Sequence, residues 1–471
     1  MHEDDDGGGS PASRTWILLV VALLGVVVGA VLWGAVRGEP AVTGPPPTLP
    51  DPSTSTLLAP EESQESDAPE GEDSSAAPEA LEEPVEPETT TTASTEPPEP
   101  GPIQVRQDGT GDFEDLQTAI DQAQAGDIIE VGDGQWSELV VRTTGTVDEW
   151  LQITAAPGAR PIIRAQMEGQ SGFELDGVSF VEVSGFEIIG PSDTQSGAGV
   201  RIINNSDHIR VEDNVIHDFP GNGVEVIESG SIAVVGNEIY GNSRRSRFQT
   251  SGISFFKPWG DNAEGFENVI SGNIVYDNEN IVPNDREEIT DGNCVIMDNT
   301  RWPNGEYVYP GETIIENNVC FDNGGRGVHV LKADNVYVVN NTLYNNLRTD
   351  AIRGGELSAD DARNVLFRNN LIWPTDPSEA QLIVASESVA FDNNLYVLPG
   401  ASADSLEETA VIVDDAQLTN PSIDPTIADF APASDSVAVG TGSGEDIPEF
   451  DIVGTERPPL PTPGAFEPSR P

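Results

Sequence analysis

One short pattern recurs between residues 211 and 399 and restricts the fold more than any other feature. It joins an apolar stretch, an asparagine and a second apolar stretch, as in "VVGNEIYGN", "IENNVCFDN" and "VVNNTLYNN". The spacings between the aligned asparagines are 23, 36, 45, 23, 29 and 24 residues. A unit of about 23 residues cannot bury an apolar face by itself, so successive units have to stack. The aligned asparagines are Asn214, Asn237, Asn273, Asn318, Asn341, Asn370 and Asn394.

A second string precedes most of these asparagines, for example "GVRIIN", "GVEVIE", "GISFFK" and "GVHVLK". Alternation of apolar and polar residues is typical of short strands, and turn residues separate them. Helical patterns are nearly absent. We therefore predict an all-β solenoid, a right-handed parallel β-helix with three strands per coil. The aligned asparagines should stack as a ladder at one turn.

The two ends of this region resemble those of the pectate-lyase-like superfamily of right-handed β-helix repeat proteins. "DGTGDFEDLQTAIDQAQAGDIIEV" is similar to the superfamily's N-terminal motif, in which a short helix plugs the first coil. Here Asp112 would cap that helix, and Leu116 and Ile120 would share its buried face. "DPTIADFAPASDSVAVGTG" resembles a closing segment. The resemblance covers roughly residues 103–468 and implies binding on the outer face of the first sheet.

Composition divides the chain into a tail at 1–15, an apolar run at 16–36, a linker at 37–100 and the β-helix domain at 101–471. The run of 21 residues carries no charge, and as a helix it would span about 30 Å, enough for a bilayer. A cleaved signal peptide is the alternative. We predict a single-pass protein of the cell membrane with its N-terminus inside and a monomeric β-helix domain outside. The Pro-, Thr- and Glu-rich linker should be disordered, and the closing segment should begin at about residue 396.

Negative charge extends over the whole chain. Residues 1–37 contribute −2 and residues 38–100 contribute −16 to the formal net charge of −59, so −41 remains for residues 101–471. Nucleic-acid binding is disfavoured, because it requires a basic surface. Binding of an anionic polymer would need a cation or a local basic cluster.

The repeat predicts which side chains face outward on the first sheet. With Val200, Val224, Ile253, Cys294, Val328 and Ile352 aligned as inward, the next positions point out: Arg201, Glu225, Ser254, Val295, His329 and Arg353. A further row lies four positions beyond the inward residues and contains Asn204, Glu228, Lys257, Asp298, Lys332 and Glu356.

Lys257 and Lys332 are the only two lysines of the chain, and both fall in that row. Two strand spacings would separate them by about 10 Å, with Asp298 between them. The row is either a functional constellation or a structural charge ladder in which opposite charges on neighbouring strands offset each other. Long insertions border it and supply Trp259 and Trp302, which either stack on sugar rings or pack the loops. We expect a site that binds, and in the first hypothesis cleaves, a polysaccharide.

Two reactions are compatible with these residues. A lyase, ranked first, would use Lys332 or Lys257 as its base, with Arg326, His329 or Arg353 binding the substrate and Asp291 and Asp298 as possible calcium ligands. A hydrolase would use a carboxylate pair such as Glu228 and Asp298. The "D-D-G-x-D" calcium cluster of one lyase family is absent, which weakens the calcium hypothesis. The alternative is a non-catalytic glycan-binding, adhesin or envelope protein.

The two cysteines, Cys294 and Cys320, both project inward. Exported proteins often form disulfides. Because the two residues are expected on different sheets of one coil, we predict that they are buried and unpaired.

Overall fold

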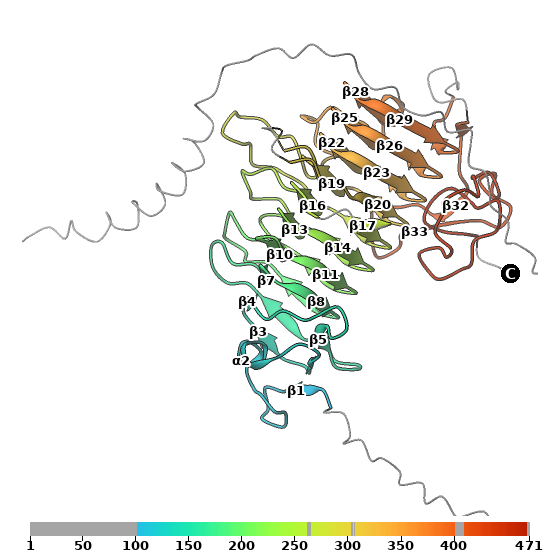
Figure 1. Ribbon diagram of the computed structural model, residues 1–471. Coiled ribbons are helices and arrows are strands. Elements are labelled where there is room, and N and C mark those ends of the chain that lie inside the picture. Colours follow the sequence, from blue (N-terminus) through green and yellow to red (C-terminus); the bar gives the residue numbers. More distant parts are fainter. Residues whose placement is uncertain (1–100, 261–264, 303–304, 306, 401–408, 469–471) are drawn as a thin grey trace, which may run out of the picture. The chain divides into compact units, whose positions relative to one another are not determined.

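The computed structural model describes residues 101–260, 265–302, 305, 307–400 and 409–468. Their strands build three long parallel sheets that wind around one interior as a right-handed β-helix (Figure 1), the hand that parallel crossovers almost always take. The all-β solenoid prediction is confirmed. Among the described residues no helix is long and apolar enough to cross a membrane. The predicted tail, membrane span and linker, residues 1–100, lie outside the described part.

Each coil contributes one strand to sheet C, then one to sheet A and one to sheet B. Sheet C, the predicted first sheet, contains β4 (Leu139–Val141), β7 (Phe173–Asp176), β10 (Val200–Ile203), β13 (Val224–Ile227), β16 (Ile253–Phe256), β19 (Val295–Asp298), β22 (Val328–Leu331), β25 (Leu357–Asp360) and β28 (Gln381–Val384). Sheet A contains β1 (Ile103–Val105), β2 (Ile128–Val131), β5 (Leu151–Ala155), β8 (Ser179–Ser184), β11 (Asp207–Glu212), β14 (Gly230–Val235), β17 (Phe266–Ser271), β20 (Glu312–Glu316), β23 (Asp334–Val339), β26 (Arg363–Arg368) and β29 (Glu387–Asp392). Sheet B contains β3 (Gln135–Trp136), β6 (Ile162–Arg164), β9 (Glu187–Ile189), β12 (Val215–His217), β15 (Glu238–Tyr240), β18 (Ile274–Tyr276), β21 (Val319–Phe321), β24 (Thr342–Tyr344), β27 (Leu371–Trp373), β30 (Leu395–Val397) and β31 (Val411–Val413).

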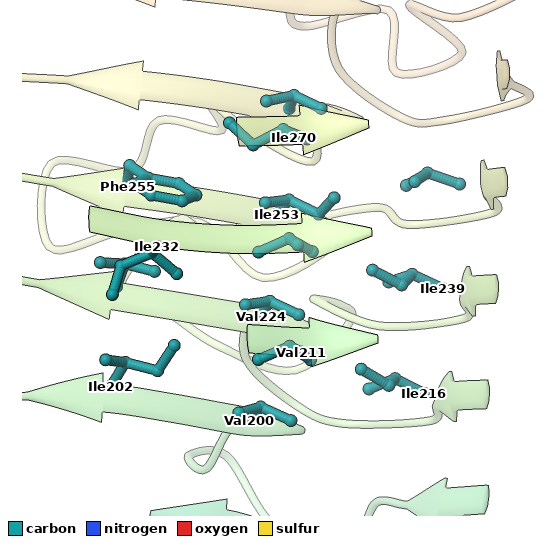
Figure 2. Close-up of a cluster of buried hydrophobic side chains, with 14 of the residues drawn as sticks. Val200, Ile202, Val211, Ile216, Val224, Ile232, Ile239, Ile253, Phe255 and Ile270 are labelled. Atoms are coloured by element: carbon teal, nitrogen blue, oxygen red, sulfur yellow. The ribbon is translucent and has the colours of Figure 1, made fainter. Parts of the chain in front are cut away.

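The core follows from the two-residue period of the strands. In β10, Val200 and Ile202 are completely buried, whereas Arg201 between them points outward. Figure 2 shows valine and isoleucine side chains from all three sheets pointing into the same interior. Each buried side chain of this size contributes about 2 kcal/mol of transfer free energy, so the stacked coils form one continuous apolar core.

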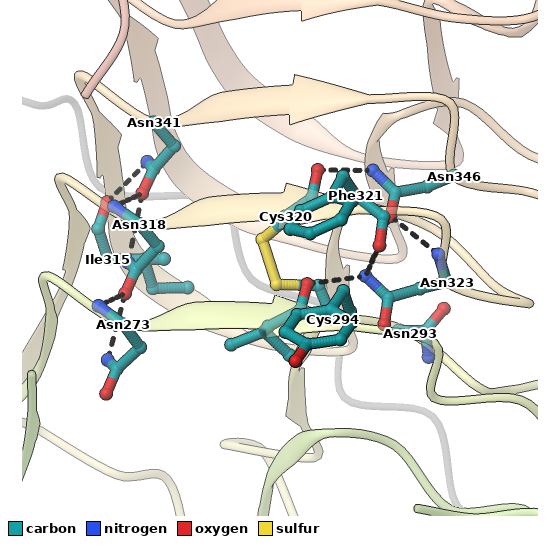
Figure 3. The surroundings of a disulfide bond; sticks show 12 residues. Asn273, Asn293, Cys294, Ile315, Asn318, Cys320, Phe321, Asn323, Asn341 and Asn346 are labelled. Atoms are coloured by element: carbon teal, nitrogen blue, oxygen red, sulfur yellow. Dashed lines mark hydrogen bonds between the residues drawn. A yellow bond between two sulfur atoms is a disulfide. The ribbon is translucent and has the colours of Figure 1, made fainter. Parts of the chain in front are cut away.

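The predicted asparagine ladder is confirmed at every position from Asn214 to Asn394. Each side-chain amide donates to the side-chain oxygen of the asparagine in the next coil, as from Asn273 to Asn318 at 2.9 Å. The same oxygen also accepts the backbone N–H of the preceding asparagine. Figure 3 shows three of these residues in line. The ladder therefore satisfies the buried polar groups of the turn between sheets A and B.

A second asparagine ladder runs parallel to the first, and the sequence analysis missed it. It consists of Asn242, Asn278, Asn323 and Asn346, each five residues after a member of the first ladder. It ends at Glu356, whose two carboxylate oxygens accept the backbone and side-chain N–H groups of Asn346, both at 2.8 Å. Glu356 is completely buried, so its predicted position in the outward lysine row is wrong. The insertion before β25 is longer than the alignment assumed.

Cys294 and Cys320 form a disulfide (Figure 3), so the prediction of unpaired cysteines is wrong. Cys294 precedes β19 at the corner between sheets B and C, and Cys320 lies in the middle of β21. Their Cα atoms are 5.7 Å apart, within the range that a disulfide requires. The distance between two sheets does not predict whether these cysteines can pair, because Cys294 lies at the corner and is close to both sheets.

A helix covers the N-terminal end of the described solenoid, whereas the segment after the last coil packs along its side. Helix α2 (Leu116–Gln122) buries Leu116 and Ile120 against the first coil, as predicted. Its cap is Asp115, which accepts the Thr118 N–H, and not Asp112. After β31 the chain continues into the antiparallel pair β32 (Leu418–Asn420) and β33 (Asp429–Pro432). This segment packs on the outside of sheet B. The 3-10 turn η1 (Pro377–Glu379) precedes β28.

Candidate functional site

A cleft of about 610 Å³ lies on the outer face of sheet C. Its floor is formed by outward side chains of β10, β13, β16 and β19, which the strand pairing places in two rows. The first row contains Arg201, Glu225, Ser254 and Ile296, and the second contains Ile227, Phe256 and Asp298. The cleft therefore lies on the face where the resemblance implied binding.

Insertions between sheets B and C build the walls of the cleft. The segment before β16 contributes Phe248, Gln249 and Thr250, and the segment before β19 contributes Asp291. The Phe248 side chain is 75% exposed at the rim. The Thr250 hydroxyl is buried and has no hydrogen-bond partner among the described residues. The walls thus offer an exposed apolar ring and an unused polar group to a ligand.

Two aspartates with raised pKa values face this cleft. Burial and the neighbouring Asp291 raise the pKa of Asp298 to about 7, against the opposing charge of Lys332. Burial raises the pKa of Asp291 to about 6, although a hydrogen bond from Asn293 and the charge of Arg326 oppose the shift. Both carboxyls therefore exchange protons closer to neutral pH than ordinary aspartates do, which suits them to acid–base chemistry.

Arg201 and Glu225 form an ion pair at the other side of the floor. The Arg201 Nε donates to Glu225 at 2.8 Å, and its Nη1 lies 3.3 Å from Glu174. Glu225 also accepts the Asn222 amide at 2.8 Å. Arg201 is thus already neutralised by two carboxylates before any ligand arrives. Both residues belong to the outward row predicted from the repeat, although neither was among the predicted site residues.

The two lysines share one register, as predicted, but they lie at a turn. Lys257 and Lys332 each follow the last residue of a strand, with left-handed φ angles of 52° and 48°. Asn299 stands between them, because the Lys257 N–H bonds to the Asp298 carbonyl and the Asn299 N–H bonds to the Leu331 carbonyl. The placement of Asp298 in this row is wrong by one residue. Neither lysine is among the residues that line the cleft.

Lys257 is held by its neighbours. Its Nζ lies 3.2 Å from a carboxylate oxygen of Glu228 and 5.1 Å from the centre of the Trp302 ring. Lys332 is exposed. The Glu228–Lys257 contact matches the structural charge ladder considered above.

Trp259 and Trp302 lie in the loops beside this turn. Trp302 packs edge-on against Tyr307, whose hydroxyl donates to the Gly260 carbonyl at 2.8 Å. Trp259 is 37% exposed. Tyr307 therefore joins the two loops, with Trp302 packed against it, and sugar stacking by either tryptophan stays a prediction.

Arg326, His329 and Arg353 lie together beyond the end of the cleft. His329 points outward from β22, as predicted, but it is covered. Burial and the charge of Arg326 hold its pKa well below the usual value. Arg353 precedes β25, so the outward position predicted for it belongs to Ser358. Likewise Ile296 takes the outward position assigned to Val295. In both coils a long insertion displaced the alignment.

The calcium prediction named Asp291 and Asp298 as ligands. Asp291 and Asp298 are close enough to influence each other electrostatically. Among the described residues, however, no group of three or more His, Cys, Asp or Glu side chains is arranged to hold a metal ion. Calcium takes six to eight oxygen ligands, so these two carboxylates alone do not complete a calcium site, and calcium binding stays a prediction.

One comparison with known proteins agrees with the architecture. A family model described as a right-handed β-helix region matches residues 280–423. A solved pectate lyase has 16% identity and a TM-score of 0.46, covering 75% of this chain and 91% of that one. A rhamnogalacturonan lyase has 16% identity and a TM-score of 0.41, covering 68% of this chain and 91% of that one. An alginate lyase from Paenibacillus has 17% identity and a TM-score of 0.35, covering 60% of this chain and 94% of that one. A search of curated proteins finds no match. At these identities the chemistry must be argued from the site's own residues.

Proposed function

We propose that this chain binds and hydrolyses a polysaccharide in the cleft on sheet C. Asp298 is the proton donor and Asp291 is the partner carboxylate. The observation that carries the proposal is the pair itself, in which burial raises the pKa of the two cleft aspartates to about 7 and about 6. Paired carboxyls with separated pKa values are the machinery of glycoside hydrolysis.

The roles follow from the order of the two pKa values. Between pH 6 and 7, Asp298 keeps its proton and donates it to the glycosidic oxygen as the bond to the anomeric carbon breaks. Asp291 is ionised, and it either activates a water molecule or attacks the anomeric carbon itself. The proton released by the water returns to the carboxylate pair. Proton NMR of the first product distinguishes inversion from retention at the anomeric carbon.

The charge of the cleft favours an uncharged glycan. The floor and walls carry the carboxylates of Glu225 and Asp291, and that of Asp298 once it has given up its proton, against one arginine. Arg201 is already paired with Glu225 and Glu174. A uronate would bring further negative charge to this face, where repulsion would weaken its binding. A lyase with a lysine base, ranked first from the sequence, is therefore second here. Its support is the shared register of Lys257 and Lys332.

The test is a substrate panel for the full-length chain in mild detergent. Xylan, galactan and laminarin represent uncharged glycans, and polygalacturonate and alginate represent uronates. We expect new reducing ends from an uncharged glycan, with or without added calcium, and loss of that activity in Asp298→Asn. Unsaturated ends from a uronate that disappear in Lys332→Ala would replace hydrolysis by lysis. Binding without any cleavage would favour the non-catalytic surface protein.

We also propose that residues 16–36 anchor the protein with its β-helix outside the cell. The uncharged run of 21 residues and the Pro- and Glu-rich linker support this arrangement. The protein should stay in the membrane fraction after extraction at high pH. External protease should then remove the β-helix domain from intact cells. Release of the whole chain by the alkaline wash would contradict the anchor.

A further inference from the structure

We propose that the cleft is closed at one end, so that the enzyme removes short pieces from a chain terminus and does not cut within the polymer. The inference rests on the function proposed above and concerns the mode of attack. It follows from the part of sheet C that lies beyond Asp298 in the stack.

The outer face of sheet C is covered immediately after the cleft. The outward row continues from Ile296 to His329 on β22 and Ser358 on β25. His329 is 5% exposed and Ser358 is 2% exposed, although both positions point away from the core. Ser358 is hydrogen-bonded through its hydroxyl to the Gly355 N–H at 3.0 Å and to the Gly355 carbonyl at 3.1 Å. The insertion before β25 thus folds back over its own strand.

Arg326 ties this cover to the wall of the cleft. Its guanidinium donates to the Thr290 carbonyl at 3.1 Å and to the Arg353 carbonyl at 2.8 Å. Thr290 belongs to the insertion before β19, and Arg353 belongs to the insertion before β25. The two insertions are therefore joined across the face of β22, over His329. We call Thr290, Arg326 and Arg353 the end wall.

The reactive pair stands against this wall. Asp291 follows Thr290 directly in the sequence, and its charge interacts with the Arg326 guanidinium. Asp291, Ile296 and Asp298 are the last residues that line the cleft in the direction of β22. In the other direction the floor continues through Ser254 and Glu225 to Arg201. Three strand spacings separate the β19 and β10 coils, about 14 Å.

A glycan lying along the stack therefore has room on one side of the reactive pair and a wall on the other. Only a short terminal piece fits between Asp298 and the end wall. A chain that continued past the wall would have to leave the cleft at the position of the scissile bond. This geometry predicts release from an end, with one product size from the first minutes of the reaction.

The experiment follows the uncharged glycan of the panel that the full-length protein cleaves. We expect reducing ends to accumulate while the viscosity of the polymer stays near its starting value. Hexasaccharides of the same glycan, blocked at the reducing or at the non-reducing end, identify which end enters. One block should slow release by about tenfold or more, equivalent to a loss of at least 1.4 kcal/mol of transition-state binding. An early drop in viscosity, or equal rates for both blocked oligomers, would overturn the closed end and leave the hydrolase intact. Failure to cleave any glycan would overturn both.

Arg326→Ala should open the wall. The Arg326 backbone N–H and carbonyl bond to Asn293 and Cys294, and these bonds survive the loss of the side chain. We expect longer products and a lower penalty for the blocked oligomer, while the melting temperature reports whether the fold is retained. Arg245→Ala is the matched control. Within the described part of the chain, the Arg245 guanidinium also bonds only to backbone carbonyls, those of Pro191, Thr194 and Asp218. Unchanged product lengths in a folded Arg326→Ala protein would contradict the wall.

Discussion

Asp298 and Glu356 are both carboxyls whose pKa is raised by burial, to about 7 and about 8, yet one points out of the solenoid and the other points into it. Asp298 ends strand β19, points outward and lines the cleft. Glu356 precedes β25, points inward and ends the second asparagine ladder. A raised pKa alone therefore does not mark a site. What matters is whether the proton can reach a ligand, and only Asp298 meets that condition.

The largest expected effect is on kcat, which should fall when Asp298 is replaced and not when Glu356 is replaced. Asp298→Asn keeps the size of the side chain but removes the proton donor, so kcat should fall by about 100- to 10,000-fold. Glu356→Gln should leave kcat within about twofold, because that carboxyl is sealed in the core. Both variants are assayed for reducing ends on the uncharged glycan. An Asp298→Asn enzyme with near-normal kcat would remove Asp298 from the reaction.

The wild-type pH profile adds a second measurement to the same comparison. Asp291 must be ionised and Asp298 protonated, so activity should rise through about pH 6 and fall above about pH 7. The two apparent pKa values that limit this profile belong to the coupled pair of aspartates and not to either residue alone. A rate that kept rising up to pH 9 would indicate that the reaction needs a deprotonated base and not the protonated Asp298.

The disulfide is linked to both carboxyls through neighbouring residues, and its removal should give the next largest effect. Cys294 is four residues before Asp298, and the Cys320 carbonyl accepts the side chain of Asn346, which also donates to Glu356. Replacing both cysteines by serine opens a loop of 26 residues, which costs about 3 kcal/mol of unfolding free energy in the chain-entropy model. Denaturant unfolding measures the loss. A Ser171→Ala protein, altered far from the disulfide, serves as the control, and equal stability of the double variant and the wild type would contradict the prediction.

A comparable but pH-dependent effect is expected from Glu356→Gln. The pKa of Glu356 is higher in the folded chain than the value of 4.5 expected for the unfolded chain. Its contribution to stability is therefore complete below about pH 4.5 and is lost as the pH rises through about 8. Relative to the wild type, the Gln variant should gain about 3 kcal/mol between pH 5 and pH 7, since one pKa unit is 1.36 kcal/mol. Unfolding curves at the two pH values test this, and parallel pH dependence in both proteins would refute it.

The fold was predictable because its determinants are periodic. The first ladder, the alternating cores and the outward face all follow from one repeat, and a single chain contains several copies of it. The second ladder was equally visible, since Asn242, Asn278, Asn323 and Asn346 end four of the repeats. It was missed because only the first asparagine of each repeat was aligned.

The site was less predictable because it depends on insertions, which have no period. Asp298 was shifted by one position and Glu356 by several, both directly after a long insertion. In the coils without such errors, Arg201, Glu225 and Ser254 were projected correctly onto the floor of the cleft. The disulfide and the end wall depend on the path by which the insertions return to the corner between sheets B and C. Neither secondary-structure propensity nor the alternation of apolar and polar residues specifies that path.

The smallest expected effect concerns the lysine row, whose members lie beside the site and outside the cleft. The charge of Lys332 lowers the pKa of Asp298, so Lys332→Met should raise that pKa. The alkaline limb of the pH profile should then move upward by about half a unit, because an exposed charge acts through water. Lys257→Met is the matched control, since Lys257 is paired with Glu228. Salt should shrink the shift, as it screens exposed charges. If instead Lys332→Met abolished activity at every pH, the lysine would be a catalytic base after all, and Asp298 would lose its place as the proton donor.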